Sequence, residues 1–321
     1  MKFVKRLLAL NCAIFLISCS SESTTVVEQI QVKDDFNYVT VNSTGKINYI
    51  GNNTCTISSY SEFSGFNNAA FLNLNTITSN SNKIYLIENL GKDKLFIFDK
   101  KTKVTSSSPL VYPTPLTEQG SALLSLQWND SKSLLFGIIK ADKDNSKSIN
   151  YLVTINPTTF EVIKTGLSFN QTGSYSTALN GTKLNSSSYN DNVIEINLET
   201  YTSTFLFFNA TNSFVPFTRA AVATNNILYG LKALTGAVNG VSLAKFDLQS
   251  NTYTAILPNE TYGIDSLFGR GFIDSANNQY VTITNKNNKS GILKYDILKN
   301  ATEFVPVNGD SNMVIIEKTA N

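Results

Sequence analysis

Short apolar runs separated by polar turns recur along the chain. The clearest copy spans 221–257: a first apolar run precedes a polar turn at 224–226, a second run covers 227–231, a third covers 243–247, and a fourth covers 252–256 after a turn at 249–251. Several runs alternate apolar and polar residues, and the residues between them favour turns. The stretch therefore predicts an antiparallel sheet of four strands.

This unit repeats, and its third run ends each time in Asp or Asn. Copies end at Asn42, Asp99, Asn156, Asn197, Asp247 and Asp296, with spacings of 57, 57, 41, 50 and 49 residues. A short Asp or Asn side chain at this point can accept from the backbone N–H two residues on, which closes the turn to the fourth strand. A period of roughly 40 to 50 residues with four strands is typical of a propeller blade.

The runs group into five full units and two remainders. The first unit covers 71–77, 84–87, 95–98 and 104–111; the second covers 121–128, 134–139, 151–155 and 162–169; the third covers 175–179, 182–186, 193–196 and 203–208. The fourth is the stretch described first, and the fifth covers 267–273, 279–284, 293–295 and 303–307. The remainders, 38–50 and 313–317, would form a sixth blade shared by the two termini. Such closure removes exposed sheet edges.

The expected fold is therefore all-β, a β-propeller of six four-stranded blades closed by N- and C-terminal strands. Five blades with accessory strands, or seven if 54–66 contains another, are the alternatives. The chain resembles the broad β-propeller superfamily at the level of the repeat. It lacks the Gly-His and Trp-Asp pairs of WD40 blades and the double glycine of kelch blades, so the resemblance implies no subfamily function.

The N-terminus has the pattern of an export signal. Three basic residues within the first six precede an apolar run at 7–17, which is too short to span a bilayer. The run ends in Leu16-Ile17-Ser18-Cys19, which resembles the lipobox of bacterial lipoproteins. The resemblance implies cleavage before Cys19 and attachment of lipid to that residue. We expect a signal peptide at 1–18, a lipid-anchored flexible tether at 19–35 and the propeller domain at 36–321.

These features predict a protein held in the cell envelope by lipid on Cys19, because each buried methylene of an acyl chain contributes about 0.8 kcal/mol. The residues after Cys19 lack the Asp that retains some lipoproteins in an inner membrane, so an outer membrane is expected, with its face left open. Loss of the three basic residues of the signal changes the formal charge from +2 to −1. The remaining basic residues form no cluster, which argues against nucleic-acid binding.

Composition excludes several kinds of catalysis. The chain has no histidine, and after processing Cys55 is its one cysteine, which excludes Ser-His-Asp and Cys-His catalysis, imidazole-bound metals and thiolate metal sites. We expect Cys55 to be a buried small hydrophobe. A calcium-like run at 142–146 lacks the required glycine, and 236–240 lacks the Lys-Ser/Thr of a phosphate loop. No metal or cofactor is predicted.

Two arginines are the candidate ligand-binding residues. Arg219 and Arg270 lie 51 residues apart, about one repeat, and each begins the first strand of a predicted blade. First strands line the central channel of a propeller, so both guanidinium groups could bind a carboxylate or polar sugar there. The alternative is that each pairs with carbonyl groups or a carboxylate of a neighbouring blade. Trp128 and the other aromatic residues are expected to pack between blades.

We therefore expect a binding or scaffolding protein, with an envelope protein or a glycan as partner. The alternative is a glycan hydrolase or lyase that uses paired carboxylates, as in some propellers. Four carboxylates lie near inner strands, Glu118, Asp130, Asp265 and Asp274, and are expected to end strands. An enzyme should bring two carboxylates within about 10 Å at the channel. A purely structural protein should have a channel filled with apolar side chains.

Overall fold

The structure is a computed structural model. It describes residues 34–67, 73–90, 92–113, 116, 122–142, 148–170, 176–187, 192–207, 217–233, 240–257, 259–263, 269–309 and 312–320. In these residues the regular elements are strands, apart from one 3-10 turn, η1 (Leu74–Thr76). No helix long and apolar enough to cross a membrane occurs among them.

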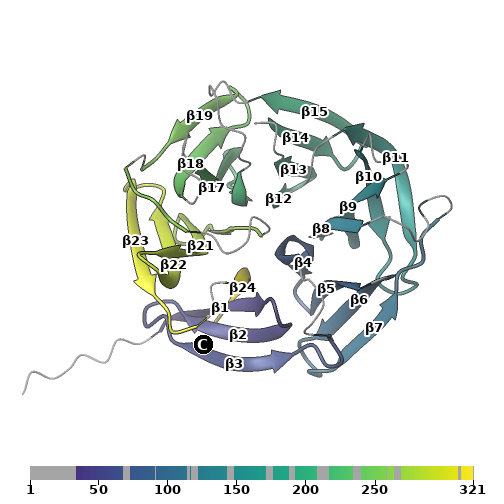
Figure 1. Cartoon of the computed structure of the whole chain (residues 1–321), viewed down its shortest axis with the longest axis horizontal. Coiled ribbons are helices and arrows are strands. Elements are labelled where there is room, and N and C mark those ends of the chain that lie inside the picture. The colour runs from purple at the N-terminus through teal and green to yellow at the C-terminus, as the bar shows by residue number, and fades with distance from the viewer. Residues whose placement is uncertain are drawn as a thin grey trace, which may run out of the picture. The chain divides into compact units, whose positions relative to one another are not determined.

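Six antiparallel sheets of four strands are arranged in a ring, which is the architecture of a six-bladed β-propeller (Figure 1). Blade 1 contains β4 (Ile77–Ser79), β5 (Lys83–Leu90), β6 (Lys92–Asp99) and β7 (Thr105–Pro109). Blade 2 contains β8 (Ala122–Asn129), β9 (Leu134–Asp142), β10 (Ser148–Ile155) and β11 (Val162–Asn170). Blade 3 contains β12 (Ser176–Asn180), β13 (Lys183–Ser187), β14 (Asn192–Asn197) and β15 (Thr202–Phe207).

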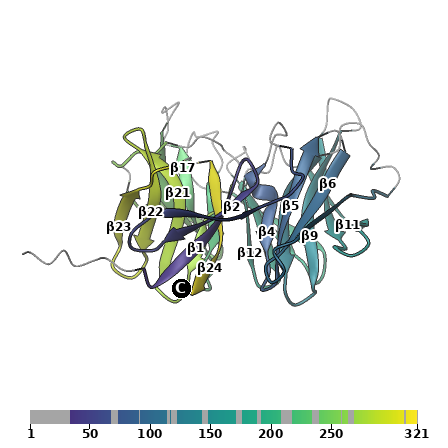
Figure 2. The ribbon, with the colours of Figure 1, turned by 90° about the horizontal axis from the view of Figure 1, so that it is seen from below.

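The ring continues through two further blades. Blade 4 contains β16 (Thr218–Val222), β17 (Ile227–Ala233), β18 (Val241–Asp247) and β19 (Thr252–Ala255). Blade 5 contains β20 (Phe272–Asp274), β21 (Gln279–Lys286), β22 (Lys289–Asp296) and β23 (Ala301–Pro306). The first strand of each blade lies nearest the axis of the ring, and the strands run between its two faces (Figure 2). The predicted fold class is confirmed.

The two ends of the domain share the sixth sheet, here called the closing blade. Its order is β24 (Met313–Ala320), β1 (Phe36–Asn42), β2 (Lys46–Gly51) and β3 (Ile57–Glu62), so the C-terminal strand is innermost. β24 contacts β4 on one side and β20 on the other, which completes the ring. The region 54–66 supplies the fourth strand of this blade, and not a seventh blade.

Three details of the predicted repeat were wrong. The first strand of blade 5 was predicted at 267–273, but β20 begins only at Phe272. Asn42 ends the second strand of the closing blade, whereas the other five anchors end third strands. The first strand of blade 1 was predicted at 71–77, but β4 begins only at Ile77. Asn73 accepts from the backbone N–H of Asn75 at 2.9 Å and thereby begins the 3-10 turn before this strand. Residues 68–72 lie outside the described part.

The five other turn anchors act as predicted. The Oδ1 atom of Asp99 accepts from the backbone N–H groups of Lys101 and Thr102 at 3.0 and 2.8 Å. The same pair of bonds forms at Asn156, Asn197, Asp247 and Asp296. Each anchor thus satisfies two backbone donors within its own turn, which is why the repeat can be read from the sequence.

Among the described residues, the hydrophobic core forms six clusters, one between each pair of adjacent blades. β6 illustrates how one strand serves two of them. Leu95 and Ile97 face blade 2, whereas Phe96 and Phe98 face the closing blade. Because successive side chains of a strand point to opposite faces, a strand buried on both faces is continuously apolar. Full burial of such a side chain contributes about 1.5–3 kcal/mol.

Candidate functional site in the central cavity

A cavity of about 320 Å³ lies on the axis of the ring, where the inner strands of all six blades meet. Its lining is mixed. The polar residues are Thr78, Ser79, Gln127, Thr177, Thr224, Arg270 and Ser275. The apolar residues include Leu179, Val222, Phe272, Ile273, Ile315 and Ile316. A small concave site with apolar walls and a few polar groups is the usual form of a small-molecule binding site.

Arg270 places a positive charge in this cavity. It lies just before β20 and pairs with Ala220 of the adjacent blade through a parallel bridge. Its Nη1 donates to the Oε1 atom of Gln127 at 3.0 Å and to the Oγ1 atom of Thr78 at 3.4 Å. Blades 2 and 5 are opposite each other in a ring of six, so the bond to Gln127 crosses the axis.

Arg270 is half-buried, and its guanidinium has lost part of its contact with solvent. Burial lowers the pKa of Arg270 to about 10, although Glu317 acts in the opposite direction. The guanidinium therefore stays protonated at neutral pH. Glu317 itself forms an ion pair with Lys100. Both groups that Arg270 contacts by hydrogen bonds are neutral.

A buried polar network surrounds this arginine. The Nε2 atom of Gln127 donates to the carbonyl oxygen and to the Oγ1 atom of Thr177, each at 3.1 Å. The Oδ1 atom of Asn75 accepts from the backbone N–H and the hydroxyl of Thr177, each at 3.0 Å. Its Nδ2 donates to the carbonyl of Leu124 at 3.0 Å. Side chains from blades 1, 2, 3 and 5 are thus connected across the centre, and such networks fix a unique geometry when their members are satisfied.

Arg219 lies close to Arg270 in the fold but does not line the cavity. It is 1% exposed. It sits in a β-bulge of β16, where the register with β17 shifts between Thr218 and Ala221, and its φ is +54°. A Cβ placed on Gly269 would meet the Nη1 atom of Arg219 at 2.0 Å, so the guanidinium occupies the space left by that glycine. The bulge alters the alternation of the strand and directs this side chain between blades.

The described candidate carboxylates end or brace strands. Asp130 is exposed at the end of β8 and accepts from the indole Nε1 of Trp128 at 2.7 Å. The carboxylate of Asp274 is 2% exposed and pairs with the Nζ atom of Lys318 at 3.0 Å. No Asp or Glu occurs among the described residues that line the cavity. No group of three or more His, Cys, Asp or Glu side chains suited to a metal ion was found in the described part of the chain.

Several predicted features lie outside the described residues. They are the signal at 1–18, Cys19, most of the tether, Glu118, Asp265, the loop from 143 and the glycine-rich turn up to 239. Cys55 is described and is 3% exposed, as predicted, and burial raises the pKa of its thiol. A protonated buried thiol is a poor nucleophile.

Trp128 both packs between two blades and lines the cavity. Its ring stacks on Tyr85 with centroids 5.5 Å apart and an angle of 8° between planes, so it packs between blades 1 and 2 as expected. It also lines the cavity. Sequence reasoning did not identify Gln127, Thr78 and Asn75 as central residues. Polar residues inside otherwise apolar first strands were the available signal, since β8 reads Ala-Leu-Leu-Ser-Leu-Gln-Trp-Asn.

Comparisons with known proteins identify the fold. No model of a known protein family matches the chain, and no curated protein sequence matches it. Among solved structures, the chain is similar to TolB from Acinetobacter baumannii, with a TM-score of 0.60 and 10% sequence identity. The match covers 87% of this chain and 65% of TolB, so this chain spans about two thirds of the TolB length.

A second match is to a chain of a mitotic checkpoint complex, with a TM-score of 0.46 and 12% identity. It covers 74% of this chain and 67% of that one. At such low identity the likeness to TolB establishes the propeller fold alone, because one fold can serve many unrelated functions.

Proposed function

We propose that this protein is a lipid-anchored binding or scaffolding protein of the bacterial cell envelope that holds a ligand or a segment of a partner in its central cavity. The cavity carries the proposal: all six blades line it, and Arg270 presents a guanidinium there. Arg219 packs against Gly269, the residue directly before Arg270, and so helps to fix the position of Arg270. The basic, apolar and lipobox-like N-terminal pattern supports export and attachment through Cys19.

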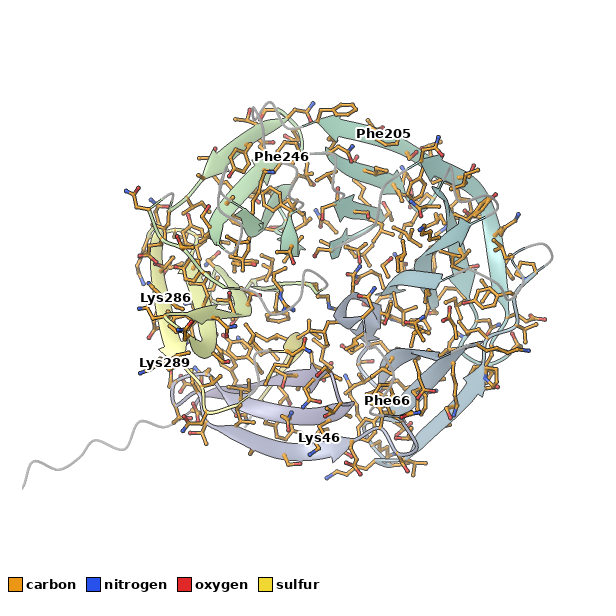
Figure 3. The ribbon with its side chains drawn as sticks, viewed as in Figure 1. Lys46, Phe66, Phe205, Phe246, Lys286 and Lys289 are labelled. Atoms are coloured by element: carbon orange, nitrogen blue, oxygen red, sulfur yellow. The ribbon has the colours of Figure 1, made fainter. Side chains whose placement is uncertain are left out.

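A photocrosslinking amino acid in place of Ser275 tests this function in intact cells. Ser275 is exposed and lines the cavity, so a bound partner should be captured there. The matched control is Lys289, an exposed residue at the start of β22 that does not line the cavity (Figure 3). We expect one dominant adduct from position 275 and none from 289. Adducts of equal yield from both positions, or none from position 275, would contradict a role for the cavity.

The anchor is tested separately by Cys19→Ser. If lipid on Cys19 holds the protein at the membrane, the variant should move from the detergent-rich phase to the aqueous phase on phase separation. The folded domain should keep its melting temperature, because Cys19 precedes the ring. Equal partition of the wild type and the variant would rule out this anchor.

The glycan-cleaving alternative requires two carboxylates near the bound sugar. The described residues that line the cavity include none, which favours binding over catalysis. Incubation with envelope glycans and analysis of reducing ends would detect cleavage if it occurs.

A further inference from the structure

The first inference concerns the chemistry of the ligand and rests on the proposed function. Arg270 forms hydrogen bonds through Nη1 with two neutral groups, and Glu317, the carboxylate that influences it, is already paired with Lys100. The structure assigns no acceptor among the described residues to the other nitrogen atoms of Arg270. Arg270 is half-buried, and its guanidinium is desolvated without a bonded carboxylate, which is energetically costly. An anion that fits its planar fork would offset that cost.

The residues that line the cavity indicate which class of anion would fit. Around Arg270 the cavity is lined by Leu179, Val222, Phe272 and Ile315, while Thr78 and Gln127 hold one edge of the guanidinium. These walls favour a ligand with a short apolar body. The cavity has a volume of about 320 Å³, which is small for a ligand-binding site. We infer that the cavity takes a monocarboxylate with a short apolar body, such as the C-terminus of an apolar peptide or a short acyl acid.

Fluorescence of Trp128 provides a direct test, because it is the chain's one tryptophan and it lines the cavity. Hexanoate serves as the probe, hexanamide as its uncharged counterpart, and inorganic phosphate as an anion without an apolar body. We expect a saturable change with hexanoate and binding at least about tenfold weaker for the other two. Equal binding of hexanamide, or no saturable change with hexanoate, would overturn the assignment.

Two variants connect the signal to Arg270. Arg270→Gln should weaken hexanoate binding by about tenfold or more. Lys289→Gln, at the start of β22 and outside the cavity, should leave hexanoate binding unchanged. Gln127→Glu is the second variant, because it keeps the shape of the site and places a competing carboxylate 3.0 Å from Nη1. It should weaken hexanoate binding as well. If a partner is still captured at position 275 in these variants while hexanoate never binds, the proposed function stands and the ligand class is wrong.

A second inference comes from the turn between β2 and β3. This turn has the same geometry as the five anchored turns. Cys55 N–H donates to the carbonyl of Gly51 at 3.0 Å, as Lys103 N–H does to Asp99 at 2.8 Å. Cys55 and Lys103 also share a positive φ, of 51° and 59°. Gly51 therefore occupies the anchor position of the closing blade, and it has no side chain to close the turn.

Asp34 supplies the missing carboxylate. Its Oδ1 accepts from the backbone N–H groups of Asn53 and Thr54 at 2.7 and 2.8 Å, and its Oδ2 accepts from the Thr54 hydroxyl at 2.6 Å. These are the donors two and three residues after Gly51, which Asp99 and its equivalents contact in their own turns. A Cβ on Gly51 would lie 2.1 Å from Oδ2 of Asp34, so the carboxylate takes the place of an anchor side chain.

We propose that Asp34 is a strap that completes the closing blade and fixes the start of the domain to one face of the ring. The strap also has a defined position relative to the cavity. In an antiparallel blade the turns after the first and third strands lie on the same face. Thr224 and Ser275, in turns after first strands, line the cavity, so the strap lies on the face that the cavity reaches.

Exchange of the carboxylate between positions 34 and 51 tests the strap. Asp34→Ala should lower the melting temperature by about 2–5 °C, since three hydrogen bonds are lost. Gly51→Asp should restore it in the double variant, because an anchor side chain is then present in its own turn. The control Asp35→Ala should cause a smaller change, since its carboxylate accepts from Asn53 Nδ2 at the surface at 3.2 Å.

The single variant Gly51→Asp distinguishes the position of Asp34 from its contribution to stability. It should keep the melting temperature near that of the wild type but displace Asp34, which should speed tryptic cleavage after Lys33. If Gly51→Asp destabilises the domain as much as Asp34→Ala, and the two effects add in the double variant, the two carboxylates do not share one place and the strap is disproved.

Discussion

The centre of the ring and the spaces between its blades are filled by opposite kinds of side chain. Between blades 3 and 4, Phe246 and Leu228 lie in an apolar cluster at 0% and 1% exposure. On the axis, Asn75, Gln127 and Arg270 connect the inner strands through hydrogen bonds. The difference indicates that apolar packing between neighbouring blades holds the ring together, while the centre carries polar groups that hydrogen-bond to one another.

Truncation of a buried aromatic side chain between two blades should have the largest effect on stability. Phe246→Ala should lower the free energy of unfolding by about 3–5 kcal/mol, because it removes a buried ring and leaves a cavity. Urea denaturation measures the loss. Phe205, which is 38% exposed on the outer strand of blade 3, is the matched control, and Phe205→Ala should change stability far less (Figure 3). Similar losses in the two variants would contradict the assignment of stability to the spaces between blades.

A substitution in the centre should have a smaller effect on stability. Asn75→Ala removes the acceptor of the Thr177 N–H and hydroxyl, both buried, and should cost about 1–3 kcal/mol. The same urea experiment measures the loss. A loss larger than that of Phe246→Ala would show that the central network, and not the apolar clusters, dominates the stability of the ring.

The turns at the rim should contribute less again. Asp247→Ala removes the acceptor for Gln249 and Ser250 N–H and should lower the melting temperature by about 2 °C. Asp247→Asn should stay close to the wild type at neutral pH, because Asn156 and Asn197 do the same work in other blades. Equal losses for Ala and Asn would mean that the hydrogen bonds of the turn do not matter.

The smallest expected effect depends on pH. Backbone hydrogen bonds from Ser250 and Gln249 lower the pKa of Asp247 in the folded state. Stability from this group is therefore present above its ordinary pKa and is lost as pH falls through the lowered folded value. Asp247→Asn should thus lose less of its melting temperature than the wild type between pH 7 and about pH 3. Parallel curves for both proteins would contradict this.

The anchor of the closing blade could not be predicted from the sequence. The repeat predicted five full blades, because each of their anchors acts on backbone donors two and three residues away, and the remaining strands at the two ends predicted the sixth. In the closing blade Gly51 has no side chain, so Asn42 was taken as its anchor although it ends a second strand. The residue that does the work, Asp34, lies 20 residues from Thr54, and no local pattern connects them.

The order of residues was enough to predict most of the strands, the period, the turns and the sharing of one blade by both ends. These features depend on alternation and on hydrogen bonds within a few residues, which the order of residues records directly. The different positions of the two arginines depend on packing and could not be predicted in this way. Arg270 lines the cavity, whereas Arg219, at the equivalent place one repeat earlier, is buried against Gly269. The difference arises from a bulge in β16, which changes the face to which a side chain points. Whether such a bulge forms depends on how two neighbouring strands and blades fit together.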